Sequence, residues 1–417
     1  SAPMLTISEE VQKKLQDQAY RIVDAIEVIG GTNVQFAHDP ISGRVVVIEI
    51  NPRTSRSSAL ASKATGFPIA LISAMLACGL TLDEIPCGKY GTLDKYVPDG
   101  DYIVLKFARW AFEKFKGVED KLGTQMRAVG EVMSIGRTVE ESLLKAVRSL
   151  EIGLFHLYDA KFDDMTETQL LDYIQIGTDD RIYAIAQMLR LGCDIDRIHS
   201  VSAIDAFFLQ KLSHIVQMEQ LLQEHPGDSK FLKMAKQTGF SDKEIGLLWQ
   251  MDEEDIFHIR KQHGILPVYK MIDSCASEFD SYIPYFYSTY EEENESIVSD
   301  EHKIIVLGSG PVRIGQGVEF DYSTVHAVQT IQSAGYEAII INNNPETVST
   351  DYTCSDKLYF EPLCVEDVMN IIELEQPDGV IATLGGQTAI NLAEPLRTRG
   401  VNIIGTNCDA IERAENR

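Results

Sequence analysis

The sequence predicts a protein of several domains, part mixed α/β and part all-α. The prediction rests on two changes of hydrophobic period along the 417 residues. Residues 1–152 combine strand and helix patterns, residues 153–300 carry helical patterns with almost no strand signal, and residues 301–417 alternate continuous apolar strands with helices. Each pattern is typical of a different layer architecture, so we expect three domains with these boundaries.

Composition narrows the function classes. A net charge of −26 repels nucleic acids and anionic membranes, so neither is an expected partner. No apolar run has the length of a bilayer span, and no signal-peptide pattern occurs at the start. The seven cysteines include no CxxC pair, which argues against a zinc site or a disulfide framework and favours a reducing, cytoplasmic location.

The first region opens with a helical pattern over 8–28. Two strand patterns follow at 33–37 and 44–51, and the turn-forming residues between them predict a hairpin with a long loop. Further strands are expected at 101–110 and 130–135. Thr138 begins a capping-box sequence that opens a helix.

In the middle region we expect a helix that begins at Ser202 and runs to His225, before a Pro-Gly pair. The acidic run at 291–300 is predicted to be a solvated linker. The last region is expected to form a parallel, doubly wound sheet, because buried strands alternate with helices. Its strands are predicted at 303–307, 338–342, 357–360, 379–384 and 401–404.

The hairpin carries the most specific polar pattern. Residues two apart in a strand share a face, so Asn33 and Gln35 point the same way, as do Glu49 and Asn51. A loop centred on Ser42 places Gln35 opposite Glu49, and Asn33 opposite Asn51. We call these four residues the polar square. Its oxygens suit a hard cation such as Mg²⁺ that also contacts nucleotide phosphates, although a solvent-facing strand surface would look the same.

An arginine-rich segment follows the polar square. Residues 52–58 contain Arg53, Arg56 and four hydroxyl side chains, but no acid. A guanidinium is a fixed fork that binds carboxylates and phosphates through two parallel hydrogen bonds. In a strongly acidic protein this segment is a candidate anion site.

Several stretches resemble a known family. The run Glu49-Ile50-Asn51-Pro52-Arg53 resembles the metal-binding strand of ATP-grasp enzymes. The longer run 48–67 resembles the large subunit of carbamoyl-phosphate synthetases, and the resemblance extends over essentially the whole chain. Other matching stretches are 129–133, 135–138, 267–270 and 287–292. The chain starts on Ser1 without a methionine and ends on a helical pattern, so we expect an internal fragment.

The resemblance implies an identity for each domain. Residues 1–152 would be the C-terminal part of the first ATP-grasp domain, which forms carboxyphosphate. Residues 153–300 would be the helical oligomerisation domain with its linker. Residues 301–417 would be the Rossmann-like domain that precedes the second ATP-grasp domain, where carbamoyl phosphate is made.

It also implies the site residues. Gln35, Glu49 and Asn51 would bind Mg²⁺ or Mn²⁺ that bridges the ATP phosphates, with Gln35 and Glu49 also near the nucleotide. Arg53 would be the catalytic residue that contacts the transferring phosphoryl group or bicarbonate. Arg56 would lie near the reaction chamber and its exit. Phosphoryl transfer needs such a set because its catalysis is mainly positioning and charge neutralisation.

The family's activity is the synthesis of carbamoyl phosphate from bicarbonate, ammonia and two ATP, through carboxyphosphate and carbamate. Its product serves arginine and pyrimidine biosynthesis. The implied partners are a glutaminase small subunit, which supplies ammonia, and further copies of the chain through the helical domain. We expect the chain to be inactive alone.

A Gly-rich turn at 308–315 follows the first strand of the last region. It is not a dinucleotide fingerprint, because Arg313 stands at the third glycine position and the next strand ends in three asparagines. The alternatives are an anion site and simple turn chemistry. By resemblance, an internal carbamate route passes four residues: Arg313, Gly317, Glu319 and Glu346.

Two other functions compete with this interpretation. Another ATP-grasp carboxylate-activating ligase would share Glu49, Asn51 and Arg53, but it does not predict the helical domain or the Gly-rich start of the last region. A non-enzymatic scaffold would use the helical domain for assembly and would bind no nucleotide. Metal-dependent nucleotide binding distinguishes the scaffold from either enzyme.

Overall fold

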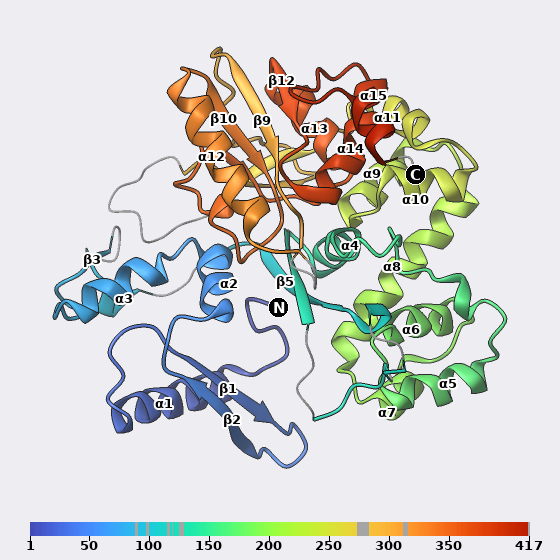
Figure 1. The fold of residues 1–417 in the computed structure, drawn as a ribbon. Coiled ribbons are helices and arrows are strands. Elements are labelled where there is room, and N and C mark those ends of the chain that lie inside the picture. Colours follow the sequence, from blue (N-terminus) through green and yellow to red (C-terminus); the bar gives the residue numbers. More distant parts are fainter. Residues whose placement is uncertain are drawn as a thin grey trace. The chain divides into compact units, whose positions relative to one another are not determined.

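The fold is known from a computed structural model. The structure describes residues 1–87, 91–96, 100–114, 117–118, 120–124, 129–272, 283–311 and 316–415. The chain forms two compact units (Figure 1). One holds Ser1–Asp101 with Ile272–Ile283, and the other holds Tyr102–Met271 with Pro284–Arg417.

The first unit contains the predicted helix and hairpin. The Ser8 side chain accepts a hydrogen bond from the Val11 backbone nitrogen and so caps the first helix. The arginine-rich segment 52–58 turns into a helix at Arg56. The elements in chain order are α1 (Glu9–Ala25), β1 (Asn33–His38), β2 (Val45–Asn51), α2 (Arg56–Thr65), α3 (Ile69–Ala77), β3 (Pro86–Cys87) and β4 (Gly91–Thr92).

The helices were compared with the length and apolarity that a membrane-spanning helix needs. Across the described residues, no single helix has both the length and the apolarity to cross a bilayer. Helices α2 and α3, which meet at a bend of 116°, reach those thresholds only when they are counted as a pair.

The second unit begins with β5 (Ile103–Trp110) and β6 (Val129–Gly136), both predicted as strands, and the two pair antiparallel. Helix α4 (Val139–Ser149) packs on this pair and begins at Thr138, whose hydroxyl accepts a hydrogen bond from the Glu141 backbone nitrogen. Every residue of α4 is buried, its charged residues included. Buried charges need partners, and those of α4 find them in the rest of this unit.

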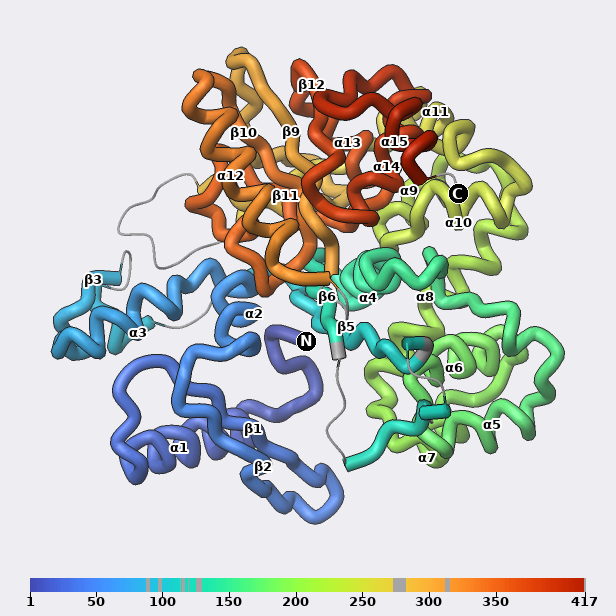
Figure 2. Tube along the Cα trace, viewed as in Figure 1, coloured from blue at the N-terminus to red at the C-terminus, as the bar shows by residue number. Residues whose placement is uncertain are grey.

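A helical bundle follows α4, and in Figure 2 its chain passes from green to yellow. Its helices are α5 (Glu167–Ile176), α6 (Arg181–Arg190), α7 (Ile195–Ser202), α8 (Ala206–Glu224), α9 (Ser229–Thr238), α10 (Asp242–Trp249) and α11 (Glu253–Gln262). Their apolar faces share one core with α4. The predicted helix start at Ser202 is wrong, because Ser202 ends α7 and Asp205 caps α8 by accepting a hydrogen bond from the Phe207 nitrogen.

A six-stranded sheet forms the rest of the second unit, with the order β12-β9-β10-β11-β8-β7. Its strands are β7 (Val268–Met271), β8 (Tyr285–Thr289), β9 (Lys303–Leu307), β10 (Glu337–Ile341), β11 (Lys357–Tyr359) and β12 (Gly379–Ile381). Neighbouring strands from β12 to β8 run parallel, as expected for the last region, and β7 is antiparallel to β8. The predicted strand at 401–404 is reduced to one bridge between Val380 and Ile403.

One expectation for the middle region is wrong. Strands β7 and β8 lie within 153–300, where we expected almost no strand, and both join the sheet. The acidic run 291–300 is mostly exposed and forms no helix or strand, as predicted for a solvated linker, and two contacts hold it: Glu295 accepts a hydrogen bond from the Met271 nitrogen, and Glu291 pairs with Arg137. An antiparallel edge strand has exposed donors, and Glu295 satisfies one of them on β7.

Helices cover both faces of the sheet (Figure 1). The face that carries Ile305 and Ile339 packs against α13 (Val365–Glu375) and α14 (Gly386–Thr398). Helix α12 (Glu319–Ser333) contacts β9 and β10 on the other face. The chain ends with α15 (Cys408–Glu415), which contacts α14. Strands β9 and β12 are neighbours but lead to opposite faces, which makes their carboxyl ends the switch point of the sheet.

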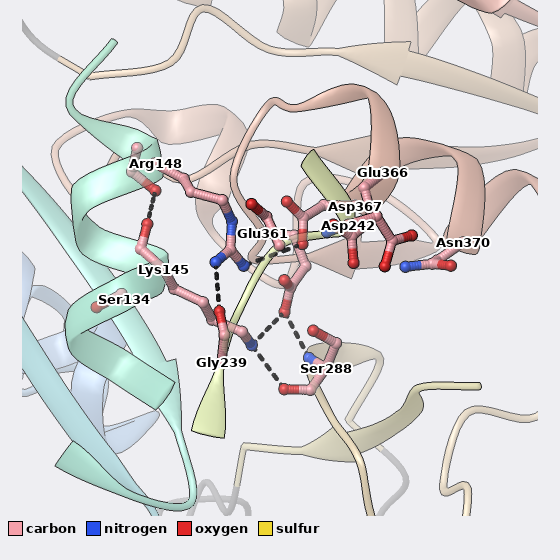
Figure 3. Close-up of polar contacts among 12 residues, drawn as sticks. Ser134, Lys145, Arg148, Gly239, Asp242, Ser288, Glu361, Glu366, Asp367 and Asn370 are labelled. Atoms are coloured by element: carbon pink, nitrogen blue, oxygen red, sulfur yellow. Dashed lines mark hydrogen bonds and ion pairs between the residues drawn. The ribbon is translucent and has the colours of Figure 1, made fainter. Parts of the chain in front are cut away.

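A buried ion network joins the helical bundle to the sheet within the second unit. Figure 3 shows Lys145 and Arg148 reaching from α4 toward acids that precede or begin α13. The Lys145 ammonium lies 3.1 Å from a Glu361 carboxylate oxygen and 2.6 Å from the Ser288 carbonyl oxygen. Arg148 donates to the Gly239 carbonyl oxygen at 2.8 Å and reaches Asp367 at 3.5 Å. These contacts fix α4 against β8 and α13.

A second part of the network links the bundle to the first turn of α13. Lys236 on α9 contacts both Asp242 and Glu366. Arg260 on α11 donates to Asp242 at 2.7 Å and to the Asn370 amide oxygen at 2.7 Å. Burial acts to raise the pKa of Glu366, but the nearby lysine and arginines outweigh it and hold that pKa at about 2. Glu366 is therefore a carboxylate at neutral pH.

Candidate functional site

The polar square lies on the hairpin of the first unit, and its predicted pairing is confirmed. Strand β1 pairs with β2 so that Asn33 faces Asn51 and Gln35 faces Glu49. Beyond these pairs the register shifts, since Phe36 pairs with Val47. The bulge adds one residue to β2 between the square and the loop. It leaves the four polar residues on one face, because both pairs lie on the same side of the shift.

Contacts inside the square fix some of its oxygens and leave others open. The Asn51 amide nitrogen donates to a Glu49 carboxylate oxygen at 3.1 Å. The Thr32 hydroxyl donates to the Asn51 carbonyl at 3.0 Å, which holds the end of β2. The Asn33 side-chain oxygen is buried and has no hydrogen-bond partner among the described residues. Gln35 and Glu49 are exposed and accessible to a ligand.

The donor set fits a hard divalent cation. It offers one carboxylate and amide oxygens on one strand face, and such ligands suit Mg²⁺ or Mn²⁺. The described residues contain no group of three or more His, Cys, Asp or Glu that could hold a metal by themselves. A cation at the square would therefore take its remaining ligands from water or from a phosphate-bearing substrate, as Mg²⁺ usually does.

The two arginines follow the square directly. The Arg53 backbone nitrogen donates to the Asn51 carbonyl at 2.8 Å, which makes a tight turn at the end of β2. The Arg53 side chain is exposed and donates a hydrogen bond to the Thr54 carbonyl oxygen at 3.4 Å. Arg56 begins α2, where the Ser55 nitrogen donates to the Ser58 hydroxyl at 3.1 Å. The local structure thus places Arg53 within two residues of the square.

The Gly-rich turn of the second unit is built differently. The Gly310 nitrogen donates to the Asn342 side-chain oxygen at 3.1 Å. A Cβ on Gly308 would lie 2.3 Å from the Asn342 side chain, so no larger residue fits there. This part of the turn is explained by close packing of β9 on β10, in agreement with simple turn chemistry.

The residues expected along a carbamate route lie around that turn. Gly317 and Glu319 are exposed at the start of α12. The Glu346 backbone nitrogen donates to the Asn344 side chain at 2.9 Å. Arg313 lies outside the described residues. These positions leave the route itself a prediction.

The second unit contains a cavity of about 690 Å³ that no sequence motif predicted. It lies at the switch point of the sheet, beside the start of α14, and four cationic side chains line it. They are Arg109, Lys114, Arg148 and Lys243. These residues are spread over more than 130 positions of sequence, so no local motif marks them.

Comparison with protein families gives three matches. Residues 1–85 match the carbamoyl-phosphate synthase L chain, ATP binding domain. Residues 131–264 match the carbamoyl-phosphate synthetase large chain, oligomerisation domain. Residues 300–413 match the carbamoyl phosphate synthase preATP-grasp domain. The polar square, Arg53 and Arg56 all lie in the first range, which supports the use of ATP by that domain, and the second range points to self-association.

All three matches name the same large chain, and together their ranges cover most of the sequence. The resemblance drawn from the motifs is therefore confirmed. This chain belongs to the carbamoyl-phosphate synthase large-chain family, a family of ATP-dependent ligases.

Proposed function

We propose that this chain supplies the metal- and phosphoryl-binding part of the site at which bicarbonate is activated by ATP. The single observation that carries the proposal is the pairing of Gln35 with Glu49 and of Asn33 with Asn51. It gathers carbonyl and carboxylate oxygens on one face, two residues from an exposed guanidinium at Arg53. The match of residues 1–85 to an ATP binding domain supports the same location.

Each residue of the site has a separate role in this proposal. Gln35, Glu49 and Asn51 would hold Mg²⁺ or Mn²⁺, which when bound neutralises charge on the phosphate oxygens. Gln35 and Glu49 would also lie near the nucleotide. Arg53 binds the anionic group at the reacting end, either the transferring phosphoryl or bicarbonate, and orients it for attack.

The reaction of the whole enzyme follows from the family. ATP phosphorylates bicarbonate to carboxyphosphate, ammonia displaces phosphate to give carbamate, and a second ATP phosphorylates the carbamate. Ammonia comes from glutamine through a glutaminase small subunit, and the product serves arginine and pyrimidine synthesis. In this proposal the domains are the C-terminal part of an ATP-grasp domain at 1–152, a helical oligomerisation domain at 153–300 and a Rossmann-like domain at 301–417. The location would be cytoplasmic.

The test uses Glu49→Gln in the whole synthase. Bicarbonate-dependent ATP hydrolysis should fall by about 100-fold or more, because a neutral amide cannot replace the carboxylate. Synthesis of ATP from carbamoyl phosphate and ADP, which uses the second site, should survive. A matched control is Glu10→Gln, an exposed acid on α1 of the same unit. If hydrolysis persists in Glu49→Gln, the polar square is only a strand surface.

A second measurement concerns the chain by itself. We expect the purified chain to form no carbamoyl phosphate from bicarbonate, ammonia and ATP. Steady product formation by the isolated chain would contradict this. Metal-dependent binding of ATP to the chain would distinguish an ATP-grasp enzyme, whether a carbamoyl-phosphate synthase or another ligase, from a non-enzymatic scaffold. A scaffold should bind no ATP.

A further inference from the structure

The end of strand β2 joins the two parts of the proposed first site. Asn51 is the last residue of the strand, and Arg53 follows it after a single proline. The pair Asn33 and Asn51 is also the last pair of a two-stranded sheet, so the ladder does not hold the chain beyond it. Arg53 can act on a group bound at the polar square only if the chain leaves β2 in a fixed direction.

Two restraints on that direction lie within the turn itself. The Arg53 backbone nitrogen donates to the Asn51 carbonyl oxygen at 2.8 Å, which closes a three-residue turn around Pro52. The proline ring limits the φ angle of Pro52 to about −65°, near the value that such a turn needs. Both restraints shape the turn, but neither fixes it relative to the neighbouring strand β1.

Thr32 supplies the connection to β1. This half-buried residue directly precedes β1, and its hydroxyl donates to the same Asn51 carbonyl oxygen at 3.0 Å. Its β-branched side chain has few favoured rotamers, so the direction of the hydroxyl is restricted before the bond forms. The Asn51 carbonyl therefore accepts one hydrogen bond from its own strand and one from across the hairpin. Together they fix the peptide plane from which the chain turns toward Arg53.

Gly31 allows the same segment to lie close to the other side of the turn. A Cβ on Gly31 would lie 3.1 Å from the Thr54 Cγ2 atom and 2.8 Å from the Ser73 hydroxyl oxygen. A larger residue would press on the side chain that follows Arg53, so glycine permits this close approach. Gly31 and Thr32 thus contact the chain on both sides of Arg53.

We propose that Thr32 is a positioning residue for phosphoryl transfer at the polar square. It acts through the backbone carbonyl of Asn51 and directs Arg53 toward the reacting group, so it needs no contact with nucleotide or bicarbonate. The inference rests on the proposed function, because it requires Arg53 to act on a group held at the square.

Thr32→Val in the whole synthase tests the proposal, since valine keeps the shape of threonine without its hydroxyl. The Asn51 carbonyl retains the bond from Arg53, so the variant should fold, and circular dichroism checks this. The kcat of bicarbonate-dependent ATP hydrolysis should fall about tenfold, because a small displacement of a group that acts on the reacting atoms slows the reaction strongly. Thr32→Ser keeps the hydroxyl and should stay within about twofold of wild type.

A double-mutant cycle separates positioning from a general loss of folded protein. In Arg53→Gln the guanidinium that Thr32 positions is already absent, so adding Thr32→Val should lower hydrolysis by less than about twofold. A loss of folded protein would instead lower hydrolysis by the same factor in both backgrounds. A full tenfold effect of Thr32→Val in Arg53→Gln would therefore overturn the proposal.

The matched control is Thr65→Val. Thr65 is also half-buried, belongs to the same unit and donates from its hydroxyl to a backbone carbonyl, that of Ala61 at 2.8 Å, but it lies at the far end of α2. This variant should hydrolyse ATP within about twofold of wild type. The proposal is wrong if Thr32→Val is no slower than Thr65→Val, or if Thr32→Ser is as slow as Thr32→Val.

Glu49→Gln distinguishes a failure of this inference from a failure of the proposed function. If Glu49→Gln loses bicarbonate-dependent hydrolysis while Thr32→Val keeps it, the square is the site and only the role of Thr32 is refuted. If Glu49→Gln keeps that hydrolysis, the proposed function is wrong, and the role of Thr32 is refuted with it.

Discussion

Removing the Lys236 ammonium should destabilise the second unit strongly. This side chain is 2% exposed, and its Nζ atom serves three acceptors. It donates to the Phe240 carbonyl at 2.7 Å and to Asp242 at 2.9 Å, and it also contacts Glu366. Lys236→Met keeps the length of the side chain but leaves two buried carboxylates with less compensation.

The size of this loss in stability depends on the hydrogen bonds that the two carboxylates keep. Asp242 keeps its bond from Arg260, and Glu366 keeps the one from the Asp242 backbone nitrogen at 2.6 Å. Breaking a buried ion pair from one side costs about 3–5 kcal/mol, so we expect a loss of about 4 kcal/mol. Lys236→Met/Glu366→Gln should recover about half of that loss, since it removes the carboxylate that the first change left short of positive charge.

Urea unfolding of the full chain, followed by far-ultraviolet circular dichroism, measures both effects. The control is Lys230→Met, an exposed lysine on the same helix α9, which should cost less than about 0.5 kcal/mol. A loss below about 1 kcal/mol in Lys236→Met would mean that the network adds little. A double variant less stable than the single one would show that Glu366 does not depend on Lys236.

The same network predicts that the fold loses stability at acidic pH. The folded-state pKa of Glu366 is about 2, below its ordinary value of 4.5. A depressed carboxyl pKa stabilises the fold above pH 4.5, and this stabilisation disappears as the pH falls from 4.5 toward 2. The stability difference between wild type and Glu366→Gln should therefore shrink across that window. A difference that stays constant from pH 6 to pH 3 would contradict the assigned partners.

Two further predictions concern the same unit. The melting temperature of Glu253→Gln, relative to that of wild type, should increase as the pH rises from 5 to 7.5. Burial raises the pKa of Glu253 from 4.5 to about 7, so wild type loses stability across this range as the carboxyl ionises. An equal difference in melting temperature at both pH values would contradict this. Gly385→Ala should cost about 1–3 kcal/mol in urea unfolding, because its Cβ would lie 2.1 Å from the Gly308 carbonyl oxygen. Gly123→Ala, where a Cβ meets nothing within 4 Å, is the control, and equal losses in the two variants would refute the steric argument.

The hairpin shows what a short-range pattern can predict. A two-residue period and a turn-rich loop were enough to place Gln35 opposite Glu49 and Asn33 opposite Asn51. The bulge next to Gln35 could not be predicted, because it depends on how β2 bends and not on a residue type. Whether these residues bind metal also stays a prediction, since the other ligands would come from the substrate.

The missed strands have a different cause. Residues 285–289 read Tyr-Phe-Tyr-Ser-Thr, a composition that favours a strand, and all five are buried in β8. The signal was present, but the surrounding helical patterns and the acidic run after it pointed to the end of a helical domain. Strand β8 pairs with β11, more than 70 positions later, so its place depends on a distant segment.

The buried charges explain why the cavity also escaped prediction. Lys145, Arg148 and Lys236 stand in helical patterns where a charge ordinarily marks a solvated face. They are buried because their acids come from far along the chain: Lys236 meets Glu366 across 130 positions, and Arg148 meets Asp367 across 219. Since pairing at that separation is decided by tertiary structure, a charge pattern in one sequence cannot reveal it. In the fold, the first turn of α13 places two carboxylates, Glu366 and Asp367, against the bundle, where they meet Lys236 and Arg148. Arg148 is also one of the residues that line the cavity.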